Sequence, residues 1–211
     1  MPAGQSLARC PAAPLDSGPA VSSESAPTPR RTLGARRASA IDVRLPELAP
    51  LVDRWRRATV PVASLGIVPH VTVLFPWRPP PVPAQALRDA GAAVAGVAPF
   101  ELTFRRLGRF EEQERVLYLC PEPDAPLREL TRRLAAAFPD TPPFGGRFAD
   151  PTPHVTVALA PAPDDLARLE AEIATALAPQ LPLTVTVRHL SVEEEGEDGY
   201  WSVRASLPLA G

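Results

Sequence analysis

The sequence predicts an α+β fold that is built from two similar halves. The pentapeptide Pro-His-Val-Thr-Val occurs twice, at residues 69–73 and 153–157, within apolar, β-branched runs that are typical of strands. In each half the histidine strand precedes a helix pattern and then a pair of strands. Short helices between strands that can pair antiparallel argue against a doubly wound parallel sheet. We therefore expect an internally duplicated α+β protein.

In the first half, period-two alternation marks the strands and apolar residues three or four apart mark the helices. Pro46 opens the first helix pattern, and Leu48, Val52 and Trp55 share one face of it. Pro76 ends the first histidine strand, because proline cannot donate to a strand ladder. The expected elements are strands at residues 41–45, 68–75, 100–104 and 116–120, a helix that starts at residue 46, and a helix at residues 83–97.

The second half follows the same rules. Leu127, Leu130, Leu134 and Phe138 recur on one helical face. The polar stretch EEEGEDG separates two long alternating segments and is therefore expected to form a hairpin turn. The expected elements are helices at residues 125–138 and 163–178, and strands at residues 154–160, 183–193 and 200–208.

Composition limits the domain count and the classes of function. A chain of 211 residues allows one domain, or two small lobes that share an interface. The net charge of −2 creates no whole-protein attraction to nucleic acid or to an anionic membrane. All 22 basic residues are arginine, so the chain offers no lysine for a Schiff base or a P-loop.

The N-terminal segment differs from the rest of the chain. Residues 1–38 are rich in Pro, Ala and Ser and have no apolar periodicity, so we expect a disordered tail before a folded domain at residues 39–211. No apolar run reaches membrane-spanning length, and the N-terminus lacks the apolar segment of a signal peptide. The two cysteines do not have the spacing of a disulfide framework or a zinc site. We expect a cytoplasmic protein with no membrane partner.

The repeated pentapeptide carries the candidate chemistry. Residues two apart in a strand point to the same face, so His70 shares a face with Thr72, and His154 shares one with Thr156. The valines between them point the other way and can pack under a helix. Two such strands, related by the duplication, could place two imidazoles and two hydroxyls across one cleft.

This set of groups suits a phosphodiester substrate. Imidazole titrates near neutral pH, so one ring can accept a proton while the other donates one. Threonine hydroxyls can donate hydrogen bonds to the phosphoryl oxygens, where charge must be stabilised. The scheme requires no metal. A single histidine in a strand is more often structural, but a purely structural repeat would keep the apolar pattern and not the polar pair.

The two motifs resemble those of the 2H phosphoesterase superfamily, and within it the 2′-5′ RNA ligase-like and cyclic phosphodiesterase proteins. The resemblance covers about residues 40–209, and the separation of 84 positions from His70 to His154 is in keeping with it. The closing segment LTVTVRHLSVEEEGEDGYWSV is similar to the last hairpin of that family. The resemblance implies a bilobal fold, with two antiparallel sheets around a central cleft and helices on the outer faces. It also implies metal-independent action on 2′,3′-cyclic or 2′-5′-linked ribose phosphates.

We therefore expect a phosphodiesterase that opens a 2′,3′-cyclic phosphate on an RNA end or on a small nucleotide. One of His70 and His154 would activate water, and the other would protonate the leaving ribose oxygen. Thr72 and Thr156 would hold the phosphoryl oxygens. The resemblance favours a 2′-phosphate product. No cofactor is expected, and we expect a monomer.

Residues beside the motifs are candidates for substrate binding. Arg147 lies in the Gly-rich loop before the second motif and could bind phosphate. Phe144, Phe148 and Trp77 flank the motifs, and one of them could stack on a base. Core packing is the expected role of Phe75.

Three alternatives remain open. RNA end joining through a 2′-5′ bond would use the same site, although residues 158–160 lack the basic residue that ligase-like members often carry there. A non-catalytic nucleotide-binding module would retain the cleft, but retention of both complete motifs argues against it. A metallohydrolase would use His70 and His154 as ligands, with Asp150 as the nearest carboxylate.

Overall fold

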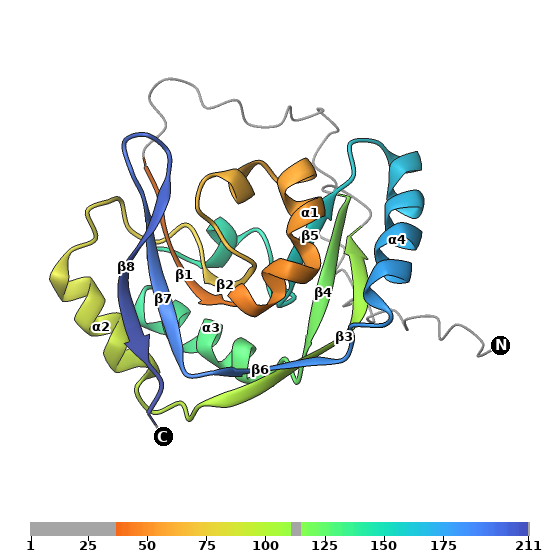
Figure 1. The fold of residues 1–211 in the computed structure, drawn as a ribbon. Helices are drawn as coiled ribbons and strands as arrows, with labels where there is room; N and C mark the ends of the chain where they lie inside the picture. The colour runs from red at the N-terminus through yellow and green to blue at the C-terminus, as the bar shows by residue number, and fades with distance from the viewer. Residues whose placement is uncertain (1–36, 111–114, 211) are drawn as a thin grey trace.

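The computed structural model describes residues 37–110 and 115–210. Residues 1–36 of the predicted tail lie outside this part. The described chain has the predicted α+β architecture, with two four-stranded antiparallel sheets. In Figure 1, β1, β7 and β8 lie to the left, β3 and β4 lie to the right, and α1 lies between them.

Both sheets are assembled from strands that are distant in sequence. Sheet A has the order β2-β1-β7-β8, and sheet B has the order β5-β4-β3-β6. The strands of sheet A are β1 (Ser39–Arg44), β2 (His70–Leu74), β7 (His189–Glu195) and β8 (Trp201–Pro208). The strands of sheet B are β3 (Phe100–Phe110), β4 (Val116–Glu122), β5 (Val155–Leu159) and β6 (Leu183–Val187).

Three helices have first-turn residues that favour a helix start, and the helix predicted from residue 46 begins as a 3-10 turn before α1 starts at Ala49. Pro50 and Pro126 lie in the first turns of two helices, where the missing N–H costs no hydrogen bond. Asp164 and Asp165 lie in the first turn of a third, where a negative charge interacts favourably with the helix dipole. The helices are α1 (Ala49–Thr59), α2 (Ala84–Val94), α3 (Ala125–Ala137) and α4 (Pro163–Leu177), with single 3-10 turns at η1 (Pro46–Leu48), η2 (Pro61–Ser64) and η3 (Pro143–Gly146).

The duplication extends to the register of the strands. β1 pairs with β2 so that Asp42 faces Thr72, and β4 pairs with β5 so that Tyr118 faces Thr156. In both pairs the register shifts by one position immediately before the residue that faces the threonine. Such a bulge re-aims the side chains that follow it. The two lobes therefore repeat an irregularity as well as a motif.

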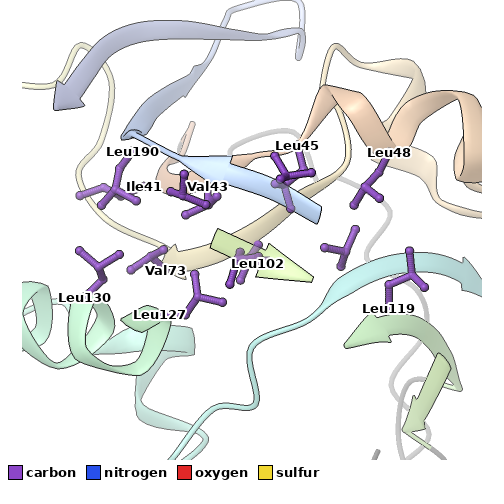
Figure 2. Close-up of a cluster of buried hydrophobic side chains, with 14 of the residues drawn as sticks. Ile41, Val43, Leu45, Leu48, Val73, Leu102, Leu119, Leu127, Leu130 and Leu190 are labelled. Atoms are coloured by element: carbon purple, nitrogen blue, oxygen red, sulfur yellow. The ribbon is translucent and has the colours of Figure 1, made fainter. Parts of the chain in front are cut away.

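One hydrophobic core runs through both sheets. α2 contacts β8, α3 contacts β2, and α4 contacts β4, so helices cover both sheets. Figure 2 shows Leu127 and Leu130 of α3 pointing toward Val73 of sheet A, with Leu102 and Leu119 of sheet B in the same cluster. Because the lobes share this core, the position of one motif strand depends on the other lobe.

The main departure from the predicted elements lies at residues 183–193. The sequence alternates without a break there and predicts one strand, but the chain leaves sheet B after Val187 and enters sheet A at His189. The same polar alternation suits both strands, so no local signal marks the crossing at Arg188. β3 is also longer than predicted, ending at Phe110. Within the described segments, no helix has the length and apolar character needed to cross a bilayer.

Candidate active site

The two histidine strands come together although they belong to different sheets. β2 and β5 contact each other. His70 is the first residue of β2, and His154 immediately precedes β5. The alternation has the predicted sense, since the motif valines are buried while the histidines and threonines are partly exposed. Both His-x-Thr pairs therefore lie on the faces that remain accessible.

Main-chain hydrogen bonds orient the two imidazoles in the same way. Nδ1 of His70 lies 2.8 Å from the carbonyl oxygen of Val68, and Nδ1 of His154 lies 2.8 Å from that of Thr152. A carbonyl oxygen can only accept a hydrogen bond, so Nδ1 carries the hydrogen in both rings. In a neutral ring, Nε2 is then the nitrogen that can accept a proton. The neutral imidazoles of His70 and His154 therefore adopt the same tautomer.

Charged groups surround His70. Arg44 faces it across the β1–β2 pair and forms a 3.0 Å ion pair with Glu193 of β7. Burial is the main cause that lowers the pKa of His70, and the nearby Arg56 cation acts in the same direction. The hydrogen bond to Val68 and the Glu193 carboxylate oppose this shift. His70 therefore favours the neutral form at pH 7.

Two buried carboxyl groups lie beside the first motif. Asp42 is 2% exposed and Glu193 is 3% exposed. Burial raises the pKa of Asp42 to about 7, although a hydrogen bond from Thr72 and the charge of Arg44 oppose the rise. Burial also raises the pKa of Glu193, and neighbouring Asp42 adds to the effect. This cluster of two carboxyls and one guanidinium was not predicted from the sequence.

Two aromatic rings pack against His154 in the second lobe. Phe110 and Tyr118 stack with their centroids 4.4 Å apart. His154 meets both rings edge-on, at centroid distances of 5.1 Å and 5.4 Å. A Cβ at Gly108 would overlap the Tyr118 ring, so a glycine is required opposite it. The second histidine thus lies in a packed aromatic environment.

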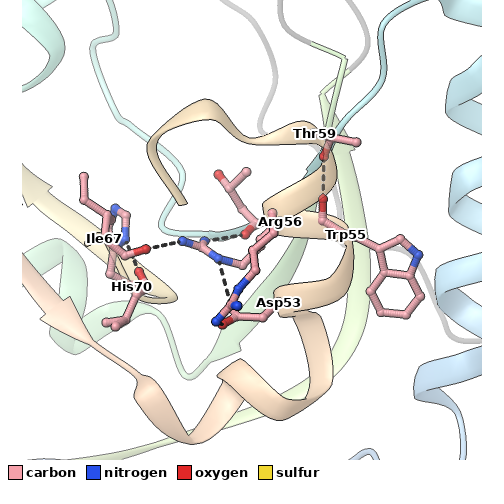
Figure 3. Close-up of polar contacts among 9 residues, drawn as sticks. Asp53, Trp55, Arg56, Thr59, Ile67 and His70 are labelled. Atoms are coloured by element: carbon pink, nitrogen blue, oxygen red, sulfur yellow. Dashed lines mark hydrogen bonds and ion pairs between the residues drawn. The ribbon is translucent and has the colours of Figure 1, made fainter. Parts of the chain in front are cut away.

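Arg56 of α1 connects the two motif segments. Its guanidinium, 1% exposed, donates from Nη1 to the carbonyl oxygen of Thr156 at 3.0 Å and from Nη2 to that of Ile67 at 2.9 Å. Figure 3 shows these bonds, with Asp53 on the other side of the guanidinium at 3.5 Å from Nε. Ile67 leads into the first motif, and Thr156 belongs to the second. A buried cation therefore fixes the spacing of the two strands.

α1 holds the lobes together at two further points. The indole N–H of Trp55 donates to Glu172 of α4 at 2.8 Å. The main-chain N–H of Leu159, at the end of β5, donates to the Thr59 hydroxyl at 3.1 Å. The sequence assigned α1 only a packing face, and the four-residue spacing from Val52 to Arg56 was the available signal that Arg56 points inward.

The predicted binding loop lies at the far end of the first motif strand. The N–H of Phe144 donates to the carbonyl oxygen of Phe75 at 2.6 Å, which attaches η3 to the end of β2. Phe148 is 43% exposed and lies edge-on to Phe144 at 5.8 Å. The Arg147 guanidinium lies 5.4 Å from the centre of the Phe148 ring. The loop thus presents one exposed ring with a cation beside it.

Trp77 occupies a different environment from the other predicted aromatic residues. Its side chain is 3% exposed and packs edge-on against Phe138 at 5.2 Å. No ring face remains open for a nucleobase. This burial argues against the stacking role that the sequence suggested, and it arises because Trp77 follows β2 directly into the core.

In its described part, the structure offers no set of metal ligands that a metallohydrolase would need. No group of three or more His, Cys, Asp or Glu side chains in residues 37–110 and 115–210 is placed to hold a metal ion. Asp150, the carboxylate predicted as nearest to the histidines, forms an ion pair with Arg128 of α3.

A cavity of about 330 Å³ lies beside the first motif. Arg44, the cross-strand neighbour of His70, forms part of its wall, as do Ser191 and Ser206. His189, the third histidine of the chain, also lines it. Apolar residues such as Val43, Val185 and Val203 line the rest of the cavity, and none of the motif histidines or threonines lines it.

Known families and structures show what the chain is similar to. The profile of the 2′-5′ RNA ligase superfamily matches residues 45–199, which include both motifs. No curated protein sequence gives a match.

Solved structures with the same fold include E. coli LigT complexed with 3′-AMP, with a TM-score of 0.54 and 16% identity over 83% of this chain and 99% of that one. E. coli LigT complexed with NADP+ gives a TM-score of 0.51 and 18% identity, with the same coverage. The protein TT0787 of Thermus thermophilus gives a TM-score of 0.52 and 22% identity, over 82% of this chain and 98% of that one. At these identities, the likeness establishes a shared fold.

Proposed function

Because the chain belongs to the 2′-5′ RNA ligase superfamily, we propose that it is a metal-independent phosphodiesterase that hydrolyses 2′,3′-cyclic phosphates of RNA ends or small nucleotides. The observation that carries the proposal is the meeting of two identical His-Val-Thr segments from different sheets. Their imidazoles share one tautomer, in which Nε2 is the nitrogen available for proton transfer. Two equivalent rings suit a reaction that needs both a base and an acid.

The proposed reaction moves one proton at each ring. Nε2 of a neutral imidazole takes a proton from water as the water oxygen attacks phosphorus. The second ring starts as imidazolium and gives its Nε2 proton to the ribose oxygen as the phosphorus–oxygen bond breaks. Thr72 and Thr156 donate hydrogen bonds to the phosphoryl oxygens, where charge accumulates. Exchange with solvent returns both rings to their starting states.

His70 suits the role of the base. Burial lowers the pKa of His70, so the ring is neutral at pH 7 and can accept a proton. His154 would then be the acid. Opening of the cyclic phosphate at the ribose 3′ oxygen would leave a 2′-phosphate, which is the product that the family resemblance favours.

A small nucleotide is the substrate that the surroundings support best. Phe148 offers an exposed ring for a base, and Arg147 lies beside it for a phosphate. Phe144 packs edge-on against Phe148 and supports that ring. One structure of LigT, which has the same fold, is complexed with 3′-AMP.

The test is turnover of a panel of 2′,3′-cyclic nucleotides and of oligonucleotides with cyclic-phosphate ends, with and without a chelator. We expect hydrolysis that the chelator leaves unchanged and that is lost in the double variant His70→Gln/His154→Gln. Activity abolished by the chelator would indicate a metal-dependent enzyme. Binding without turnover on every substrate would indicate a nucleotide-binding module.

RNA end joining is the second candidate, since the matching family includes RNA ligases by name. The same site would let a ribose hydroxyl of one RNA replace water or serve as the leaving group. Incubation of RNA halves that carry a 2′,3′-cyclic phosphate and a 5′-hydroxyl tests it. A 2′-5′-joined product that requires both histidines would establish this activity.

A further inference from the structure

The hydroxyl of Thr72 has a buried partner that limits what it can do. Asp42 on β1 faces Thr72 across the β1–β2 pair, so the carboxyl and the hydroxyl are neighbours that can form a hydrogen bond. A threonine hydroxyl has a single hydrogen to donate. An ionised carboxylate can only accept, so an ionised Asp42 takes this hydrogen away from any substrate.

The groups around Asp42 favour its neutral form. Among the described residues, Arg44 of β1 and Glu193 of β7 carry the charges that act on Asp42. His70 of β2 lies two residues from Thr72, opposite Arg44. The one guanidinium is already paired with Glu193 at 3.0 Å. Two buried carboxyls therefore share one cation, and like charges in a buried site disfavour ionisation of both.

The hydrogen bonding of the Asp42 carboxyl also fits a neutral acid. Its Oδ1 is buried and has no hydrogen-bond partner among the described residues. Leaving an ionised oxygen unpaired in this position would cost the desolvation of a charge, whereas a neutral carboxyl costs much less. The raised pKa of Asp42, about 7, supports the same conclusion.

We infer that Asp42 is a positioning residue whose proton frees the Thr72 hydroxyl to donate to a phosphoryl oxygen. Protonated Asp42 gives its own O–H to the Thr72 oxygen, and the hydrogen of Thr72 then turns toward the substrate. Loss of the Asp42 proton reverses the bond and removes the donor. This inference rests on the proposed function for the role of Thr72, and it adds a control on that role.

Among the described residues, the position opposite the second motif threonine holds a phenol and not a carboxyl. Thr156 faces Tyr118, whose pKa is raised by burial, so the phenol stays neutral throughout the range where Asp42 titrates. The donor from the second lobe is thus constant with pH, and the donor from the first lobe is lost as the pH rises through the pKa of Asp42.

The kinetic test compares wild type with Asp42→Asn, whose amide can donate to Thr72 at every pH. Above pH 7 we expect kcat/KM of wild type to fall about 100-fold per pH unit, because the acid histidine and Asp42 each lose a proton. In the variant the fall should be about 10-fold per unit, from the histidine alone. An equally steep fall in both proteins would overturn the inference.

A double variant shows whether Asp42 acts through Thr72. Thr72→Val and Asp42→Asn/Thr72→Val should share one pH profile, because without the hydroxyl the Asp42 proton has nothing to orient. The exposed Asp89→Asn on α2 is the matched control and should keep the wild-type profile. Different profiles for the two Thr72 variants would assign Asp42 another role.

Unfolding experiments test the protonation of Asp42 without any substrate. A folded-state pKa raised from 3.8 to about 7 gives stability that is complete below pH 4 and is lost as the pH rises through 7. Wild type should therefore lose stability relative to Asp42→Asn between pH 4 and pH 7 in urea titrations. A constant difference would refute a neutral Asp42, even if the enzyme hydrolyses cyclic phosphates. Conversely, the predicted difference in a protein with no turnover would leave Asp42 neutral and refute the proposed function.

Discussion

The two motif strands carry the same candidate catalytic side chains, but different residues surround them. Both copies keep the pentapeptide, the bulge before the facing residue and the main-chain bond to Nδ1. Around His70 lie two carboxyls and two guanidinium groups, whereas around His154 lie two aromatic rings. The position opposite the motif threonine is Asp42 in one lobe and Tyr118 in the other. The repeat supplies the same His and Thr side chains to both lobes, and the neighbouring residues give them different surroundings.

The largest expected effect comes from removing either histidine. His70→Ala and His154→Ala should each lower kcat by roughly 10²- to 10⁴-fold on a 2′,3′-cyclic nucleotide, because each removes one proton transfer. With the roles divided in this way, His70→Ala loses the acidic limb of the pH profile, and His154→Ala keeps only the part of the alkaline limb that Asp42 contributes. His189→Ala, at an exposed third histidine, is the control. Full activity of either motif variant would exclude a two-histidine mechanism.

Arg56→Met removes the link between the strands. Two buried carbonyl groups lose their donor, at about 1–3 kcal/mol each, so we expect the free energy of unfolding to fall by about 3 kcal/mol. Loss of the cation should also raise the pKa of His70, which NMR titration can follow because the chain has three histidines. Arg57→Met, 72% exposed in its side chain on the same helix, should change neither. An unchanged His70 titration in Arg56→Met would show that this charge is not felt at the site.

Gly108→Ala should perturb the aromatic surroundings of His154 and leave those of His70 unchanged. The new Cβ overlaps the Tyr118 ring, and such overpacking typically costs about 1–3 kcal/mol. The displaced ring should lower kcat through His154 and leave the His70 titration unchanged. Gly91→Ala, where the nearest atom is 4.0 Å away on Leu207, is the matched control and should stabilise α2 slightly. Equal stability of the two alanine variants would contradict the close Gly108–Tyr118 packing.

The smallest effect is expected at the exposed loop. Phe148→Ala should raise KM about 5- to 10-fold with kcat unchanged, since base stacking on an aromatic ring is worth roughly 1–3 kcal/mol and this ring is only partly covered. Val62→Ala removes another exposed apolar side chain and should not change KM. A KM that is the same for a base-free ribose cyclic phosphate and a cyclic nucleotide would remove Phe148 from the binding site.

Local patterns in the sequence were sufficient for the motif faces and most elements. Period-two alternation placed both His-x-Thr pairs on accessible faces, and the strands show that burial pattern. The two antiparallel sheets were expected from the family resemblance, whereas the α+β class was predicted from the order of these elements. These features depend on residues close together in the chain, which is why a single sequence reveals them.

The neighbours of the motifs depend on strand pairing, and no local pattern encodes it. Asp42 precedes Thr72 by 30 residues and meets it only because β1 pairs with β2 in one register. Glu193 reaches the same cluster from β7, because the apparent single strand at residues 183–193 divides at Arg188. An acidic residue in an alternating segment looks like a solvated position until its partner strand is known.

The placement of β7 and β8 also sets the order in which the protein can fold during synthesis. Sheet B is complete in sequence once β6 ends at Val187, but β1 waits for its partner β7 until Glu195 has been made. At about 5–20 residues per second, the ribosome makes β7 several seconds after β1. During that time β1 can pair with the first histidine strand β2 on one side, while its other side still lacks β7. The emerging chain must keep that edge from pairing elsewhere until β7 has been made.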